Sequence, residues 1–266
     1  MSTNAWQRAE MPSGAVAVLD ERTLTNSNAN LLTVVKPGQK VLDVGCGAGA
    51  ITRGIVDLVG VSGSVSGVDR SSELITLAKE KFRAISNLSF TCADILDDSI
   101  SGKYQVITIA RTLQWIADPG PVVRKMISML DREGILCVLD YDHTRIEWDP
   151  EPPPAMRFFY DAFLRWRADA GMDNAIGDNI RGLLAAQQLT ILTVLDQSEY
   201  SDHTMPDFQA RIALWTIVAE TRGKQMTADG YVTEEQRQKA IADYQHWCTS
   251  EARSMKLHLK ATHARV

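Results

Sequence analysis

The nine residues from Val41 to Gly49, VLDVGCGAG, constrain the fold of this chain more than any other segment. Val41, Leu42 and Val44 are typical of a strand buried on both faces of a parallel sheet. The three alternating glycines that follow predict a tight turn that can approach a ligand closely, because glycine has no Cβ and tolerates positive φ. The next stretch, AITRGIVDLV, has apolar residues at helical spacing. A strand, a glycine turn and a helix N-terminus together favour a site for a nucleotide-like cofactor.

The alternation of apolar strand and helix continues as far as Tyr141. Further strands are predicted over 64–69, 88–94, 104–110 and 134–141, with helical stretches between most of them. One of these helices follows Ser71, a residue type that favours the N-cap position. Regular alternation of this kind predicts an α/β fold with a doubly wound, mostly parallel sheet.

The alternation breaks after Tyr141. A proline-rich connector, EWDPEPPPAM, precedes two predicted helices that end near Gln187, and a strand then resumes over 189–195. Helices inserted beside the ligand edge of such a sheet commonly form a cap. The sequence therefore predicts an N-terminal helical extension (1–36), a cofactor-binding core (37–145), a helical cap insertion (146–188) and a C-terminal completion of the core with additional helices (189–266).

The charge and the cysteines argue against several classes of partner. A formal net charge of -5 and a pI of about 5.6 provide no global attraction to nucleic acid. The four cysteines are scattered, without a CxxC pair or a nearby histidine cluster, which predicts reduced thiols and no metal site. No stretch is typical of a signal peptide or of a membrane span, so we expect a cytoplasmic protein.

Two classes of cofactor fit the glycine turn. With Ala50 the turn matches the loosened dinucleotide fingerprint GxGxxG/A, so an NAD-dependent oxidoreductase stays open as an alternative. Dinucleotide dehydrogenases, however, usually keep this strand apolar up to the first glycine, whereas here Asp43 lies two positions before Gly45. This order of acid and glycines resembles motif I of the class I S-adenosylmethionine-dependent methyltransferases.

The resemblance continues through three further motifs. GVDRS (67–71) is similar to the second motif, in which Asp69, 24 residues after Gly45, would bind the vicinal ribose hydroxyls. CADI (92–95) is similar to the third motif, where Asp94 and the following N–H would meet the adenine edge. The region from strand four to strand five also matches, except that DREG (131–134) replaces a KPGG-like turn. The resemblance covers about residues 36–142 and is closest to small-molecule enzymes of the ubiquinone/menaquinone-biosynthesis type.

This resemblance implies a seven-stranded sheet with an antiparallel last strand, and in-line methyl transfer from S-adenosylmethionine to a small molecule. A nucleic-acid or protein methyltransferase is the other alternative, but the sequence ARTL (110–113) stands where an NPPY-type tetrapeptide is expected for methylation of a planar exocyclic amine. The residues that the family pattern places at the cofactor are Asp43, Gly45, Cys46, Gly47, Gly49, Asp69, Arg70, Asp94, Ile95, Ala110 and Arg111.

Residues for the methyl acceptor are harder to assign. Ligands of open α/β sheets bind beyond the carboxyl ends of the strands. The candidates are Gln114, Trp115, Tyr141, His143 and Phe159. His143 would act as a general base only if the acceptor arrives protonated, and a loop histidine without a catalytic role is the simpler interpretation. Because the cofactor carries its own activated methyl group, no catalytic residue is predicted. The acceptor, the methylated atom and the oligomeric state stay open.

Overall fold

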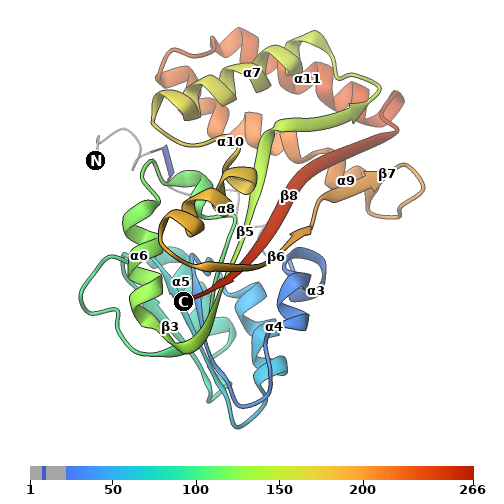
Figure 1. The fold of residues 1–266 in the computed structure, drawn as a ribbon. Helices are drawn as coiled ribbons and strands as arrows, with labels where there is room; N and C mark the ends of the chain where they lie inside the picture. Colours follow the sequence, from blue (N-terminus) through green and yellow to red (C-terminus); the bar gives the residue numbers. More distant parts are fainter. Residues whose placement is uncertain (1–7, 10–21) are drawn as a thin grey trace.

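The structure, a computed structural model, describes residues 8–9 and 22–266, and one eight-stranded sheet runs through it (Figure 1). Seven strands follow the order β3-β2-β1-β4-β5-β8-β6, and β7 pairs with β8 beside them. The strands are β1 (Lys40–Val44), β2 (Ser64–Asp69), β3 (Leu88–Cys92), β4 (Tyr104–Ala110), β5 (Leu130–Asp149), β6 (Thr190–Asp196), β7 (Glu199–Asp202) and β8 (Ser254–Arg265).

The directions of the strands confirm the predicted fold. β1 to β5 pair in parallel, and β8 runs antiparallel to β5, β6 and β7. The short β7 was not predicted. β5 is also longer than the predicted 134–141 and takes in the predicted turn over 131–134, where Arg132 and Glu133 are exposed.

Both faces of the sheet are covered because successive side chains of a strand point to opposite sides. Val41 packs toward α4, α3 and the 3-10 helix η1, whereas Leu42 and Val44 pack toward α6 and α8. On β3, Phe90 packs against Ile75 of α5. The helices of the core are α3 (Leu24–Ser27), η1 (Ala29–Thr33), α4 (Ala50–Val59), α5 (Ser72–Lys81), η2 (Leu113–Trp115), α6 (Gly120–Met129) and α8 (Ile176–Ala186).

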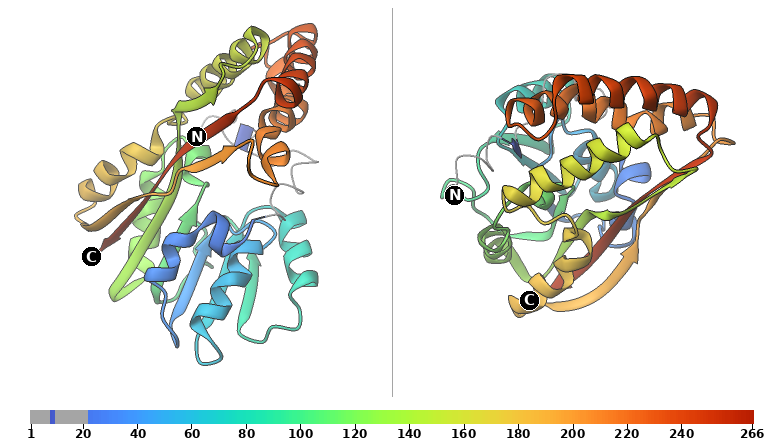
Figure 2. Two further views of the ribbon diagram at one scale, coloured as in Figure 1. Left: turned by 90° about the vertical axis from the view of Figure 1, so that its right-hand side faces the viewer. Right: turned by 90° about the horizontal axis from the view of Figure 1, so that it is seen from above.

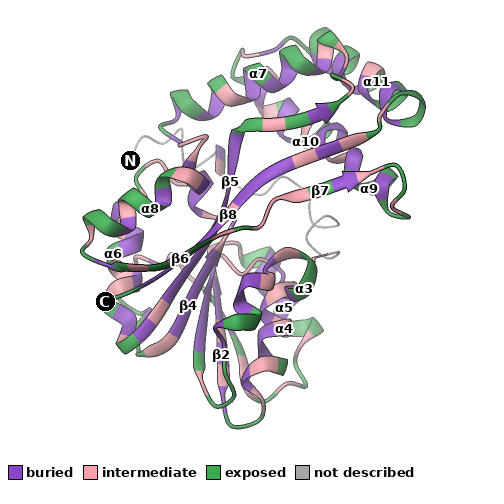
Figure 3. Cartoon of the chain, turned by 45° about the vertical axis from the view of Figure 1, so that its right-hand side comes forward, coloured by how far each residue is buried: buried purple, intermediate pink, exposed green. Residues whose placement is uncertain are grey.

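A helical cap lies beyond the carboxyl ends of the parallel strands (Figure 2). β5 and β8 extend past the rest of the sheet and remain paired as far as Asp149 and Ser254, so that they carry the cap (Figure 1). Figure 3 shows that both strands are buried along most of their length. The cap helices are α7 (Pro154–Asp169), α9 (Phe208–Ile212), α10 (Leu214–Ala228) and α11 (Glu234–Ser250).

The contacts of the later helices show which of them pack on the sheet and which pack in the cap. α8, placed in the cap insertion 146–188, buries Ile180 and Leu184 against the sheet. α10 and α11 are among the additional helices predicted within 189–266, and they bury Trp215 and Tyr244 in one aromatic core with α7. The reason is physical: large aromatic faces on α10 and α11 match those of α7, and periodicity alone does not reveal such pairing.

The N-terminal extension predicted over 1–36 falls partly outside the described residues. Its described part forms α3 and η1, which pack against α4 and β1 through Leu24 and Leu31. None of the helices in the described part of the chain combines the length and the hydropathy needed to cross a bilayer.

Candidate cofactor and acceptor site

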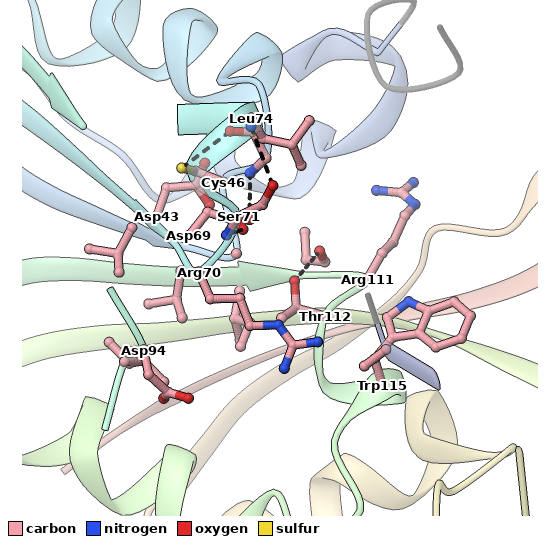
Figure 4. Close-up of a pocket in the computed structure, with 18 of the residues that line it drawn as sticks. Asp43, Cys46, Asp69, Arg70, Ser71, Leu74, Asp94, Arg111, Thr112 and Trp115 are labelled. Atoms are coloured by element: carbon pink, nitrogen blue, oxygen red, sulfur yellow. Dashed lines mark hydrogen bonds between the residues drawn. The ribbon is translucent and has the colours of Figure 1, made fainter. Parts of the chain in front are cut away.

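A cavity of about 500 Å³ lies at the carboxyl ends of β1, β2, β3 and β4 (Figure 4). Its volume is typical of sites for small ligands, and its position is the one that open α/β sheets use. All residues predicted to contact the cofactor line it, except Gly49. Figure 4 shows Asp43, Cys46 and Asp69 on one side of the cavity and Arg111 and Trp115 on the other.

The glycine turn brings the loop after β1 against the loop after β4. Gly45 has a φ of +72°, and a Cβ there would lie 2.2 Å from Oγ1 of Thr112, so no side chain fits. Gly49, the N-cap of α4, also has a positive φ, and a Cβ there would meet the ring of Phe90 at 2.6 Å. Gly49 therefore shapes the turn without lining the cavity.

Asp43 supports the turn from the side of α4. Its carboxylate is buried, and its Oδ2 accepts a hydrogen bond of 2.6 Å from Oγ1 of Thr52 in the first turn of α4. Burial raises the pKa of Asp43 to about 7; the Thr52 hydroxyl lowers this pKa, and the nearby Asp69 raises it further. Asp43 thus joins β1 to α4 and holds the glycine turn between them.

Asp69 is the last residue of β2, and both of its carboxylate oxygens accept hydrogen bonds from backbone N–H groups. Oδ2 accepts from the N–H of Gly47 and Oδ1 from the N–H of Ser71, each at 2.9 Å. Each oxygen has a second lone pair, so each can still accept a hydroxyl proton from a ligand. The Oγ of Ser71 accepts from the N–H of Leu74, which confirms the predicted serine cap of α5.

The turn after β3 supplies a third carboxylate to the cavity, that of Asp94. Oδ1 of Asp94 accepts a hydrogen bond of 2.9 Å from the N–H of Leu96, and Ile95 between them also lines the cavity. Arg70 and Cys46 complete this side of the wall. Burial raises the pKa of the Cys46 thiol well above its usual value, with Asp43 and Asp69 acting in the same direction, so the thiol stays protonated.

Arg111 ends β4 in an unusual backbone conformation and connects three parts of the fold. Its φ is +55°, and its guanidinium donates to the Tyr141 hydroxyl, to the Ser27 carbonyl and to Oε1 of Glu199 on β7. Burial lowers the pKa of Arg111, but Tyr141 and Glu199 outweigh it and leave this pKa above its usual value. The side-chain direction, which the sequence left open, is therefore toward β5 and β7.

Of the five acceptor candidates, only Trp115 lines the cavity. Tyr141 bonds to Arg111 and Glu199, and Phe159 is wholly buried in the cap. Gln114 is buried and accepts from Arg167, because α7 covers the loop after β4. The substrate-binding roles of the four residues away from the cavity stay predictions.

His143 lies within the packed interior of the cap. Its Nε2 shares a hydrogen bond of 2.7 Å with Oε1 of Gln114, and its ring stacks on Tyr141. Burial lowers the pKa of His143 well below its usual value, and the nearby Arg167 lowers it further. The imidazole is therefore neutral and has no direct access to the cavity.

Sequence reasoning missed several residues of the cavity wall, and three of these have polar side chains and come from outside the segment that runs from the end of β2 into α5. They are Arg22, Thr112 and Arg222. Arg22 precedes every recognisable motif, and Arg222 lies on a helix whose apolar residues form no clear stripe, so neither gave a signal. Among residues 8–9 and 22–266, no cluster of three or more His, Cys, Asp or Glu side chains could hold a metal ion.

Comparison with known proteins agrees with this geometry. Residues 35–158 match a family model described as a methyltransferase domain. A malonyl-[acyl-carrier protein] O-methyltransferase of Acetivibrio thermocellus is 28% identical over 132 residues, which cover 44% of this chain and 46% of that protein. A ubiquinone/menaquinone biosynthesis C-methyltransferase of Shewanella sediminis is 27% identical over 132 residues, covering 48% and 50%. The chain thus spans about half the length of the curated relatives it matches.

Solved structures share the fold at low sequence identity. A SAM-dependent methyltransferase from Aquifex aeolicus has a TM-score of 0.55 at 19% identity and covers 70% of this chain and 93% of its own. Geranyl diphosphate C-methyltransferase from Streptomyces coelicolor, in complex with S-adenosyl-L-homocysteine, has a TM-score of 0.52 at 12% identity, covering 89% and 77%. Over residues 35–158 the chain is thus similar to methyltransferase domains, and its four motifs and strand order resemble those of the class I S-adenosylmethionine-dependent methyltransferases.

Proposed function

We propose that this protein transfers a methyl group from S-adenosylmethionine to a small-molecule acceptor. The observation that carries the proposal is the convergence of the glycine turn, Asp69 and Asp94 from the ends of three neighbouring strands in one cavity. This convergence supplies backbone groups and carboxylates where an adenosyl cofactor requires them.

The residues present suit this cofactor. Asp69 would accept the two ribose hydroxyls, Asp94 and the N–H of Ile95 would meet the adenine edge, and the backbone around Gly47 and Ala110 would hold the methionine end. Because Gly45 has no side chain, the side chain of Thr112 fits closely against the turn. When bound, the cofactor supplies a methyl group that is already activated on a sulfonium.

The task left to the chain is to orient the acceptor and to exclude water. The acceptor atom bonds to the methyl carbon as the carbon–sulfur bond breaks, and the electron pair of that bond stays on sulfur. Orientation alone supplies much of the acceleration in such a displacement. We assign no general base, since His143 is buried away from the cavity.

A small acceptor is supported by the shape of the site. The cap residue Arg222 and the loop residues Trp115 to Ala117 close one end of the cavity. The two relatives described above are named for a malonyl group carried on acyl-carrier protein and for ubiquinone/menaquinone biosynthesis, so in both names the methylated group is a small organic one. The net charge of -5 also disfavours nucleic acid as the acceptor.

Thermal unfolding in the presence of cofactors tests the proposal. S-adenosylhomocysteine should raise the Tm and NAD should not, because only a ligand that binds the native state stabilises it. Asp69→Ala should lower the affinity for S-adenosylhomocysteine by about tenfold or more, since charged hydrogen bonds contribute about 1.5–3 kcal/mol. Asp98→Asn, at an exposed carboxylate outside the cavity, should leave the affinity unchanged. Stabilisation by NAD and not by S-adenosylhomocysteine would refute the proposal.

A further inference from the structure

Carboxylates gather at one end of the cavity, where Arg70 also lies, and guanidinium groups gather at the other. Asp69, Glu73 and Asp94 line the end formed by β2, β3 and α5. Arg22, Arg111 and Arg222 line the wall that also holds Trp115. If the adenosyl group occupies the acidic end, the methyl acceptor meets the arginine end.

The carboxylates nearest to the arginine end are engaged by other donors in the described part of the chain. Glu199 contacts Arg111 at 2.5 Å, and its other oxygen accepts from the Tyr141 hydroxyl at 3.2 Å, so both carboxylate oxygens are engaged. Arg22 lies within electrostatic range of Arg111, Glu199 and Asp140. No hydrogen bond or ion pair joins its guanidinium to another residue in the described part of the chain. Asp140 is buried and already accepts from the N–H groups of Gln114 and Tyr141. Neither nearby carboxylate is therefore left to pair with Arg22, and a bound sulfonium would add more positive charge.

A neutral donor lies on the same wall. The ring of Trp115 is held by guanidinium groups from two cap helices, Arg167 at 4.7 Å and Arg222 at 4.3 Å from the ring centroid. Within residues 8–9 and 22–266, the indole N–H has no hydrogen-bond acceptor. The hydroxyl of Thr112 donates to the Ala110 carbonyl and leaves no proton for a ligand. The proton donors that remain available are Arg22 and the Trp115 N–H.

We propose that the methyl acceptor is an organic acid whose carboxylate binds the guanidinium of Arg22 and the indole N–H of Trp115. This inference rests on the proposed function. A carboxylate supplies the acceptor oxygens that this wall lacks, and charge-assisted hydrogen bonds of this kind are about twice as strong as neutral ones. An anion beside the sulfonium is also favoured electrostatically in a site that excludes water. A cationic acceptor would meet two like charges.

Matched probes distinguish an acid from its neutral and cationic counterparts. The protein is saturated with S-adenosylhomocysteine and titrated with phenylacetate, phenylacetamide and phenethylamine, and separately with hexanoate, hexanamide and hexylamine. At least one of the two acids should raise the Tm of the complex, while its amide and amine should not. Equal or stronger stabilisation by the amides or amines, or no stabilisation by either acid at millimolar concentration, would overturn the proposal.

Variants assign the effect to the two donors. Arg22→Gln should weaken binding of the effective acid about tenfold or more, and Trp115→Phe, which keeps a ring but removes the N–H, by a smaller factor. Arg53→Gln removes an exposed guanidinium on α4 and should change nothing. Unaltered affinity for the acid in Arg22→Gln would contradict the assignment.

The methionine carboxylate of the cofactor is the other possible source of an oxyanion at Arg22. S-adenosylhomocysteine carries this carboxylate and 5′-methylthioadenosine lacks it. The proposal expects Arg22→Gln to change the affinities for both by similar factors. A selective loss of S-adenosylhomocysteine affinity, with the preference for acids intact, would place Arg22 at the cofactor and overturn the proposal. If S-adenosylhomocysteine fails to bind the unaltered protein, the proposed function itself fails first.

Discussion

The cofactor half of the molecule and the cap half are built on different principles. In the cofactor half, short motifs from Val41 to Asp94 place their own side chains at the ends of adjacent parallel strands. In the cap half, α7 meets α10 and α11, which lie far along the chain, through large aromatic side chains. Under the proposed function, motif geometry would therefore control the affinity for the cofactor, and long-range packing would shape the wall that faces the acceptor.

The cap half should show the largest loss of stability on truncation. Phe159 is fully buried in the cap core, and Phe159→Ala should lower the free energy of unfolding by about 3–5 kcal/mol through the lost contacts and the cavity left behind. The neighbouring Phe158 is 42% exposed, so Phe158→Ala should stay within about 0.5 kcal/mol. Urea unfolding measures both. Equal losses would show that the cap is not packed as described.

In the cofactor half, one added methyl group should lower both the affinity for the cofactor and the stability of the fold. Gly45→Ala places a Cβ against Thr112 at a φ of +72°, which should cost about 1–3 kcal/mol in strain and displace the turn. Affinity for S-adenosylhomocysteine, measured by calorimetry, should fall at least tenfold. The matched control is Gly182→Ala on α8, where an added Cβ meets nothing within 4 Å. Normal affinity in Gly45→Ala would contradict the role of the turn.

The buried Asp43 should give the cofactor half a distinctive pH dependence. Its pKa is about 7 in the folded protein and about 3.8 when unfolded, so its contribution to stability is fully present below about pH 4 and is lost as the pH rises through 7. Between these values the loss approaches at most about 1.4 kcal/mol per pH unit. Asp43→Asn should therefore gain stability relative to the unaltered protein as the pH rises. Urea unfolding at several pH values, with Asp98→Asn as control, checks this; a constant difference would refute it.

The smallest effect is expected on the exposed face of α4, within the cofactor half. Arg53 and Asp57 form an i,i+4 ion pair of 2.7 Å whose side chains are both exposed. Arg53→Gln should change the free energy of unfolding by no more than about 0.5 kcal/mol and leave affinity for S-adenosylhomocysteine unchanged. Thermal unfolding at low and high salt measures the change. A large effect would mean that the motifs alone do not determine the cofactor site.

The same contrast explains which features could be predicted from the sequence. The strand order and the cavity-lining positions of Asp69 and Asp94 follow from local patterns, because strand ends and turns depend on neighbouring residues. Arg22 could not be found, since its position depends on how the chain before β1 packs on the finished sheet. The packing of α8 on the sheet, and of α10 and α11 against α7 in the cap, likewise depends on contacts between segments distant in the sequence.

The most direct test of the account is transfer of a labelled methyl group. The protein is incubated with S-adenosylmethionine labelled at the methyl carbon and with a cell extract separated into small-molecule, protein and nucleic-acid fractions. The account predicts that the label enters the small-molecule fraction, in compounds retained by an anion exchanger before methylation, and that Asp69→Ala reduces the transfer. Label confined to protein or nucleic acid, or no transfer to any fraction, would contradict it.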